Sequence, residues 1–381
     1  MEFKVSAPGK LILYGEHAVV YQKTAVAGAL DLRTTLTFKE LPQSDSMIHL
    51  DLPTVQSDLY IPLLQILEYF SVKECPKAIE NQDQFYQYIK DFVDTLESKN
   101  NLQKLALEAV MYVLISMSQN ENLVIQPFKI TITTELAVSA GLGSSASFSV
   151  CISAAFLNWA YHQNDKKLVL DVDTLTIISQ YAFKCEKIMH GSPSGVDNSV
   201  CTYGSIIKFK NTELTPLIGV KSMKVLLVDT KVSRSTKVLV EKVASLKREL
   251  PMVYDPILDA MDSIANNALS VIEQIRDLDT EESEVAVRGC YERLMTLINI
   301  NQSLLSACQV SHPALDDICA EARKHGLAAK LTGAGGGGYA YVLLLPDTSD
   351  DVVDHLVHVL TERGFGVTLT YLGGAGVHIH G

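Results

Sequence analysis

The segment AGLGSSA, residues 140–146, contains the residue types needed to hold a phosphate group. Gly141 and Gly143 lack a Cβ, so the backbone there can turn sharply and approach an oxyanion closely. If a helix begins here, its first N–H groups have no partner within the helix and attract an anion. Ser144 and Ser145 add hydroxyls that can bind phosphate or a metal ion carried by it. The segment therefore predicts a phosphate-binding loop, with a plain strand-to-helix turn capped by serine as the alternative.

Two familiar nucleotide-binding motifs do not account for this segment. A Walker loop requires Lys followed by Ser or Thr after its second glycine, and the chain has no such string. A dinucleotide fingerprint fits the spacing at 141–146 and at 333–338, but residues 339–345, YAYVLLL, predict a strand where the fingerprint needs a helix. The alternating residues 129–136, KITITTEL, predict a half-exposed strand, unlike the apolar strand of a doubly wound sheet. A hydride-transfer enzyme is therefore a weak alternative.

Four other side chains could complete a phosphoryl-transfer site, which needs a metal ligand, a base for the acceptor and a cation for developing charge. Glu186 lies at the edge of the apolar stripe of a predicted helix, although a solvated position beside two lysines is the alternative. Asp197 lies in the turn-rich stretch 190–200, where a turn or cap residue is the alternative. Lys10 and His17 could equally be an exposed lysine and a loop histidine. Each of these residues is weak evidence alone.

Length and composition predict an ordinary soluble globular protein. The chain has 381 residues, of which 47% are hydrophobic and 20% charged, enough for about two domains. The formal charge of −12 argues against a nucleic-acid-binding surface, so local cations must attract any anionic substrate. The seven cysteines include no CxxC pair, which favours reduced thiols packed as small hydrophobes over a disulfide framework or a zinc site.

No targeting or membrane segment is predicted. Residues 1–10, MEFKVSAPGK, lack the apolar run of a secretory signal, which predicts the cytosol and leaves a peroxisomal destination open. Residues 136–164 carry no charge over a length that could span a bilayer. Several serines, an asparagine and a histidine within that stretch favour a buried core helix instead.

The hydrophobic pattern predicts two α+β domains, with helices on one face of an antiparallel sheet. A polar segment at 211–221 sets the expected boundary, giving domains 1–218 and 219–381. In the first domain we expect strands within 3–38, helices over 58–119, a strand at 128–135, a buried helix at 145–162 and a second helix from the N-cap Asp173 to Gly191. In the second we expect a strand at 223–229, helices at 234–250, 254–278, 281–307 and 312–326, and two closing strands around a helix.

Four strings together resemble the GHMP kinase family: APGKLILYGEHAVVY (7–21), AGLGSSASFSV (140–150), HGSPSGVDNSV (190–200) and KLTGAGGGGYA (330–340). They occur in the family's order and cover the chain almost end to end. The resemblance implies a two-domain α+β kinase, with an N-terminal domain like domain 2 of ribosomal protein S5, a ferredoxin-like C-terminal domain, and an active site in the cleft between them.

The resemblance also implies an activity. ATP would donate its γ-phosphoryl group to the C5 hydroxyl of (R)-mevalonate, an early step of isoprenoid precursor synthesis, with Mg²⁺ as the metal. Asp197 would accept the hydroxyl proton, and Lys10 would lower the pKa of that hydroxyl and neutralise charge in the transition state. Ser145 and Glu186 would be Mg²⁺ ligands, and His17 and Thr236 would line the substrate site. The triphosphate would lie on Ala140, Gly141, Leu142, Gly143, Ser144, Ser145 and Ala146.

One departure from the family and several alternatives accompany this interpretation. Family phosphate loops begin with Pro-x-Gly or Pro-Pro-Gly, but this chain has Ala137, Val138 and Ser139, which puts nucleotide affinity at this loop in doubt. The alternatives are another small-molecule kinase of the family, such as one acting on phosphomevalonate, or a non-catalytic ligand sensor on the same fold. The expected partners are mevalonate and ATP, without nucleic acid or membrane, and a homodimer is left open.

Overall fold

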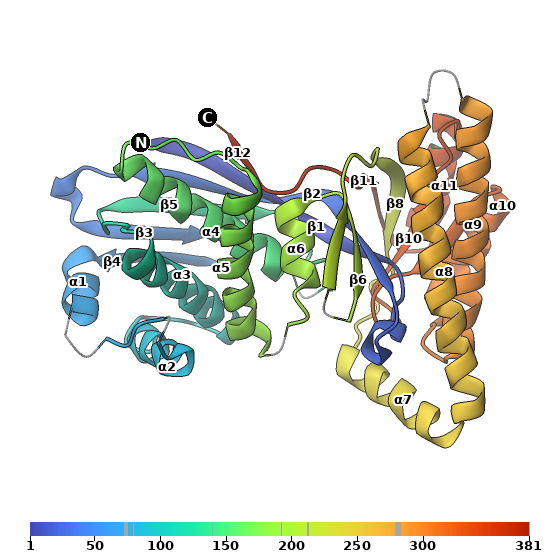
Figure 1. Ribbon diagram of the computed structural model, residues 1–381, viewed down its shortest axis with the longest axis horizontal. Coiled ribbons are helices and arrows are strands. Elements are labelled where there is room, and N and C mark those ends of the chain that lie inside the picture. The colour runs from blue at the N-terminus through green and yellow to red at the C-terminus, as the bar shows by residue number, and fades with distance from the viewer. Residues whose placement is uncertain are drawn as a thin grey trace.

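The structure is a computed structural model that describes residues 1–71, 75–78, 80–138, 140–191, 193–211, 213–278 and 283–380. Strands and helices alternate irregularly along the chain, and two helix-rich ends flank the sheet (Figure 1). The elements of the N-terminal part are β1 Glu2–Tyr14, η1 Ala18–Tyr21, β2 Ala25–Glu40, η2 Gln43–Asp45, β3 Met47–Leu52, η3 Pro53–Val55, β4 Ser57–Pro62, α1 Leu63–Ser71, α2 Gln82–Val93, α3 Asn101–Asn120, β5 Phe128–Thr134, α4 Ser144–Gln163, α5 Val172–His190, α6 Val196–Tyr203, β6 Ile206–Lys210 and β7 Glu213–Leu217.

Most helices of the second half lie where the pattern predicts them. Residues 281 and 282 of the expected third helix lie outside the described residues. The elements of the C-terminal part are β8 Met223–Asp229, α7 Thr236–Glu249, α8 Pro251–Asp277, α9 Glu284–Ala307, α10 Pro313–Lys324, β9 Ala328–Leu331, β10 Tyr339–Leu343, α11 Asp350–Glu362, β11 Gly366–Leu372 and β12 His378–His380.

The core of the N-terminal part lies between the strands and the helices α3, α4 and α5 (Figure 1). On β5, Ile130 and Ile132 are buried while the threonines between and after them are partly or fully exposed, so the predicted half-exposed strand is confirmed. Trp159 of α4 is fully buried against Phe38 of β2, with ring centroids 4.8 Å apart. The uncharged segment around α4 is therefore a core helix, as predicted. Among the described residues, no helix has both the length and the apolar character needed to cross a bilayer.

Helices cover both faces of the C-terminal strands. On β8, Val225 and Leu227 pack into the core formed with α8 and α9, whereas Leu226 and Val228 pack into the core formed with α10 and α11. The prediction of helices on one face is therefore wrong here. The sequence of β8, MKVLLVD, agrees with burial on both faces. Its run of apolar residues lacks the alternation of polar and apolar residues found in a strand with one solvent-exposed face.

The two parts share one sheet. The described strands join a 12-stranded sheet, in which β11 pairs with β2 at Leu372 and Leu30. The strand β12 returns to the N-terminal part and pairs with β1. The boundary between 218 and 219 falls between β7 and β8, and the division into domains 1–218 and 219–381 stays a prediction.

Two local predictions were wrong. Residues 58–62 form most of β4 instead of the start of a helix, because a short apolar run satisfies either period and pairing with β3 decides between them. The cap of α5 is Asp171, whose carboxylate accepts a hydrogen bond from the Thr174 N–H at 2.9 Å, and not Asp173, which lies in the first turn. Six of the seven cysteines are buried, as expected for thiols packed as hydrophobes.

Candidate active site

The segment 140–146 joins a turn to the start of α4. Gly143 is the N-cap residue with φ of +77°, and no described side chain caps the helix, so the serine-capped turn is not what forms. The first N–H groups of α4 are thus left without a side-chain acceptor, as a phosphate-binding helix start requires. A Cβ at Gly143 would lie 2.8 Å from Cγ of Lys10, and the Lys10 N–H donates to the Leu142 carbonyl at 2.8 Å. The absence of a side chain at Gly143 therefore allows β1 to pack against this loop.

Lys10 and Asp197 form an ion pair. Nζ of Lys10 lies 3.0 Å from Oδ1 of Asp197, and the side chains are 9% and 34% exposed. Asp197 belongs to the first turn of the helix α6, so its interpretation as a turn residue is wrong. The next residue, Asn198, donates to the Ser179 carbonyl at 3.1 Å and holds α6 against α5. The arrangement places a carboxylate that reaches solvent beside a nearly buried ammonium group.

Glu186 lies on the inner side of α5 and not on a solvated face, since its residue is 3% exposed. The Ser145 hydroxyl donates to Oε2 of Glu186 at 3.3 Å, while Oε1 is buried without a hydrogen-bond partner. Burial raises the pKa of Glu186 most, the charge of Asp197 raises it as well, and Ser145 and Lys10 lower it, so that the pKa is about 7. Lys10, Ser145, Glu186 and Asp197 therefore form one cluster drawn from four elements.

The donor set of this cluster suits a hard cation. A hydroxyl oxygen and a carboxylate are ligands that Mg²⁺ accepts in proteins. The buried Oε1 of Glu186 lacks any partner among the described residues, which is costly for a carboxylate unless a cation binds there. Ser145 and Glu186 thus fit the metal-binding role expected of them.

His190 is a neighbour of this cluster that the sequence analysis did not select. Its Nε2 lies 2.9 Å from Oγ of Ser145 and 3.9 Å from Oε2 of Glu186. His190 lies four residues after Glu186, so both side chains are on one face of α5. This spacing could have identified His190 from the sequence.

His17 and Thr236 lie outside the contacting cluster and in different environments. His17 is buried, its Nε2 lies 2.9 Å from the Ala334 carbonyl, and burial lowers its pKa. Thr236 is exposed and is the first residue of α7. Among the described residues, no hydrogen bond or ion pair joins either of them to Lys10 or Asp197. The structure therefore does not bring them into the contacting cluster.

A buried ion pair fixes the backbone next to His17. Glu16 and Lys330 contact each other with fully buried side chains, and burial lowers the pKa of Lys330. Asn301 donates to Oε2 of Glu16 at 3.3 Å, and Lys330 also donates to the Leu331 carbonyl at 2.8 Å. The end of β1 is thereby tied to β9. Sequence reasoning missed this pair because nothing in the sequence brings residues 16 and 330 together.

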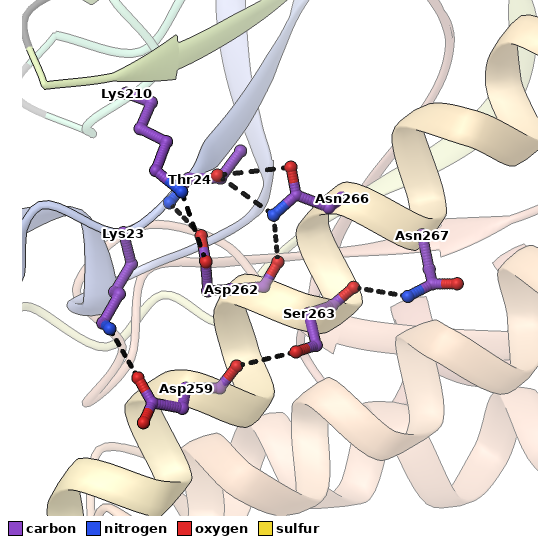
Figure 2. Close-up of polar contacts among 8 residues, drawn as sticks. All are labelled: Lys23, Thr24, Lys210, Asp259, Asp262, Ser263, Asn266 and Asn267. Atoms are coloured by element: carbon purple, nitrogen blue, oxygen red, sulfur yellow. Dashed lines mark hydrogen bonds and ion pairs between the residues drawn. The ribbon is translucent and has the colours of Figure 1, made fainter.

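The segment after η1 is held by polar side chains of α8 (Figure 2). Lys23 forms an ion pair with Asp259 at 2.5 Å, and the Thr24 N–H donates to Asp262 at 2.6 Å. Asn266 donates to the Thr24 hydroxyl at 3.2 Å. These contacts attach the loop that carries His17 to the C-terminal part.

Two hollows in the described part of the chain lie elsewhere. One of about 570 Å³ is lined by Gln274 and Arg293 among others, and one of about 560 Å³ by Tyr21 and Lys247 among others. Neither lining includes Lys10, Ser145, Glu186 or Asp197. The cluster is therefore recognised by its chemistry and not by cavity size.

Comparison with known families agrees with this geometry. The family model for the GHMP kinases N terminal domain matches residues 102–205, and the model for GHMP kinases C terminal matches residues 283–362. The fold and the site thus define a small-molecule kinase, and the chain belongs to the GHMP kinase family.

Several curated relatives that are similar over the full chain are mevalonate kinases. The mevalonate kinase of Bos taurus is 36% identical over 99% of this chain and 94% of its own length. The fold is similar to that of the Methanococcus jannaschii mevalonate kinase, with a TM-score of 0.72, 24% identity, and coverage of 98% of this chain and 99% of that one. It is also similar to the L. major mevalonate kinase in complex with R-mevalonate, with a TM-score of 0.68, 23% identity, and coverage of 98% and 96%.

Proposed function

We propose that this chain transfers the γ-phosphoryl group of ATP to the C5 hydroxyl of (R)-mevalonate. The observation that carries the proposal is the cluster in which the Lys10–Asp197 ion pair lies beside the Ser145–Glu186 pair at the start of α4. Full-length similarity to mevalonate kinases supports the choice of substrate.

The phosphates would bind at the start of α4. The N–H groups of its first turn and the positive end of its dipole supply fixed partial charges without a competing side-chain cap. Gly141, with φ of +77°, turns the chain so that the backbone approaches the phosphates. Residues 140–146 would therefore position the triphosphate and stabilise negative charge without reorganising.

Asp197 and Lys10 would act on the acceptor hydroxyl. Asp197 is the more exposed partner, so its carboxylate can accept the hydroxyl proton from a substrate entering from solvent. Lys10 is held beside it and presents its ammonium group to the oxygen that gains negative charge. Because phosphoryl transfer depends mainly on positioning and on neutralising charge, these two side chains supply what the acceptor side needs.

Ser145 and Glu186 would hold Mg²⁺. When bound, the ion neutralises charge on the phosphate oxygens and helps to align the transferred group. The role of Glu186 in this chain is to keep a carboxylate buried at the phosphate loop, with one oxygen oriented by Ser145. His17, beside the glycine-rich loop, and Thr236, at the start of α7, would contact mevalonate.

A coupled assay of ADP release tests the function. We expect turnover with (R)-mevalonate and none with phosphomevalonate, galactose or homoserine. Turnover with phosphomevalonate instead would favour the other small-molecule kinase, and absence of turnover with all four would favour the non-catalytic sensor. The presence of all four cluster residues argues against a sensor, which has no need of them. The cytosolic location stays a prediction, and a homodimer stays an open alternative.

A further inference from the structure

Arg234 lies in the segment between β8 and α7 and contacts two loops that are far apart in sequence. Its Nη2 donates to the carbonyl of Ala140, in the phosphate loop, at 3.0 Å. Its Nη1 donates to the carbonyl of Thr332, directly before the glycine-rich loop 333–338, at 3.1 Å. The guanidinium group therefore bridges the N-terminal and C-terminal glycine loops.

Glycines in both loops leave space for this one guanidinium group. A Cβ at Gly141 would lie 2.7 Å from Nη2 of Arg234, and a Cβ at Gly338 would lie 2.6 Å from Cζ. A Cβ at Gly333 would lie 3.4 Å from Nη2. Contacts below 3.0 Å do not occur for real Cβ atoms, so at least two of these glycines are needed for Arg234 to take its place. All three glycines also have a positive φ, between +68° and +77°, which favours glycine by itself, and the guanidinium group adds a steric reason at Gly141 and Gly338.

The backbone of Arg234 is linked to the acceptor side of the site. The next residue, Ser235, is the N-cap of α7 and accepts a hydrogen bond from the Val238 N–H at 3.5 Å. Thr236, the proposed mevalonate contact, is the first residue of that helix. A displacement of the start of α7 therefore moves the arginine that holds the phosphate loop.

We propose that Arg234 is a positioning residue that couples the mevalonate site to the phosphate loop, so that each substrate strengthens binding of the other. The inference rests on the proposed function for the identity of the acceptor. Arginine suits the task because its planar fork carries separate N–H groups toward two carbonyls, whereas the single ammonium group of lysine cannot reproduce that fork. Coupling between two sites is reciprocal by thermodynamic linkage, so it is measurable from the nucleotide side alone.

Isothermal titration calorimetry of the full chain tests this coupling. The dissociation constant of ADP is measured with Mg²⁺ in the presence and absence of saturating (R)-mevalonate. We expect the wild type to bind ADP about fivefold or more tightly when mevalonate is present. In Arg234→Lys we expect ADP binding to weaken about tenfold and the effect of mevalonate to disappear.

Two further variants separate coupling from general destabilisation. Gly338→Ala retains the arginine but places a Cβ against its guanidinium group, and should also abolish the effect of mevalonate. Arg33→Lys is the matched control, because Arg33 likewise donates to backbone carbonyls, of Ser6 at 3.1 Å, Ala375 at 3.2 Å and Gly376 at 2.6 Å, but touches neither glycine loop. We expect Arg33→Lys to lower thermal stability and to keep the wild-type ratio of dissociation constants.

The outcomes distinguish the two proposals. If the wild type binds both ligands independently, or if Arg234→Lys keeps the wild-type ratio, the coupling role of Arg234 is wrong while the proposed function stands. If the wild type binds ADP but not mevalonate, the proposed function is wrong and the coupling fails with it. If Arg33→Lys also loses the wild-type ratio of dissociation constants, the effect belongs to any partly buried arginine, and the inference is overturned.

Discussion

Replacing Glu186 with glutamine should stabilise the metal-free protein at pH 8. The Glu186 residue is 3% exposed, and its pKa is raised from 4.5 to about 7, first by burial and then by the charge of Asp197. Between these values the folded protein holds a proton that the unfolded chain has lost, so the free energy of unfolding falls as the pH rises through that window. Glutamine is neutral at every pH and avoids this loss.

The size of the effect follows from the change in pKa. A rise from 4.5 to about 7 corresponds to a loss of about 3 kcal/mol in the free energy of unfolding between pH 4.5 and pH 8. The nearly complete burial of the residue means that solvent does not screen the effect appreciably. We therefore expect Glu186→Gln and the wild type to be about equally stable near pH 4.5, and the variant to be more stable by about 3 kcal/mol at pH 8.

Urea unfolding in EDTA, followed by tryptophan fluorescence, measures this difference. Trp159 is the single tryptophan, is fully buried, and lies on α4, the helix that carries Ser145. It therefore reports unfolding of the core against which Glu186 lies. Glu213→Gln, at an exposed position of β7, controls for the removal of one carboxylate.

Two results would refute this reasoning. One is a set of pH-stability curves for Glu186→Gln and the wild type that run parallel from pH 5 to pH 8. The other is a curve for the control that shifts as much as that of Glu186→Gln. Adding Mg²⁺ and ADP should reverse the order of stability, because a bound cation favours the ionised wild-type carboxylate.

Three further predictions concern neighbouring groups. Asp197→Ala or Lys10→Ala should lower kcat by orders of magnitude with an unchanged circular dichroism spectrum, and wild-type turnover in either would contradict the mechanism. Gly143→Ala should raise the KM for ATP more than tenfold, because the new Cβ would lie 2.8 Å from Cγ of Lys10. An unchanged KM would show that this contact does not matter for ATP binding. Glu16→Gln should cost about 3–5 kcal/mol in urea unfolding because it leaves Lys330 buried and unpaired, and adding Lys330→Met should recover part of that loss; equal losses in the single and double variants would count against the pair.

Much of the site was predictable because local chemistry identifies it. The glycines and serines of 140–146 indicate a phosphate-binding helix start before any tertiary contact is known, and the structure forms that helix without a side-chain cap. Strings that match a family in order carried Lys10 and Asp197 from weak individual candidates to a joint hypothesis, and the resemblance as a whole added Glu186. Helix periodicity likewise located α8, whose apolar face repeats over many turns, whereas a long uncharged stretch indicated the buried helix α4.

Other features depended on long-range pairing. Residues 57–62 became a strand because β3 lies beside them, and helices cover both faces of the C-terminal strands because β8 is apolar on each side. The strand at 57–62 is not encoded in a local period, since a short apolar run is compatible with helix and strand alike, whereas burial of β8 on both faces agrees with the lack of alternation in MKVLLVD. Local propensity therefore yields to the partner that the fold supplies.

The sequence by itself indicated the class of protein, a small-molecule kinase, and predicted for it a phosphate loop, a cation, a base and a metal ligand. Only the tertiary structure decided how these groups affect one another. It buried Glu186 beside Asp197, paired Glu16 with Lys330, and placed Arg234 between two glycine loops. The physical reason is that burial and electrostatic coupling depend on distances in space, and residues hundreds of positions apart have no spacing in the sequence from which such distances follow.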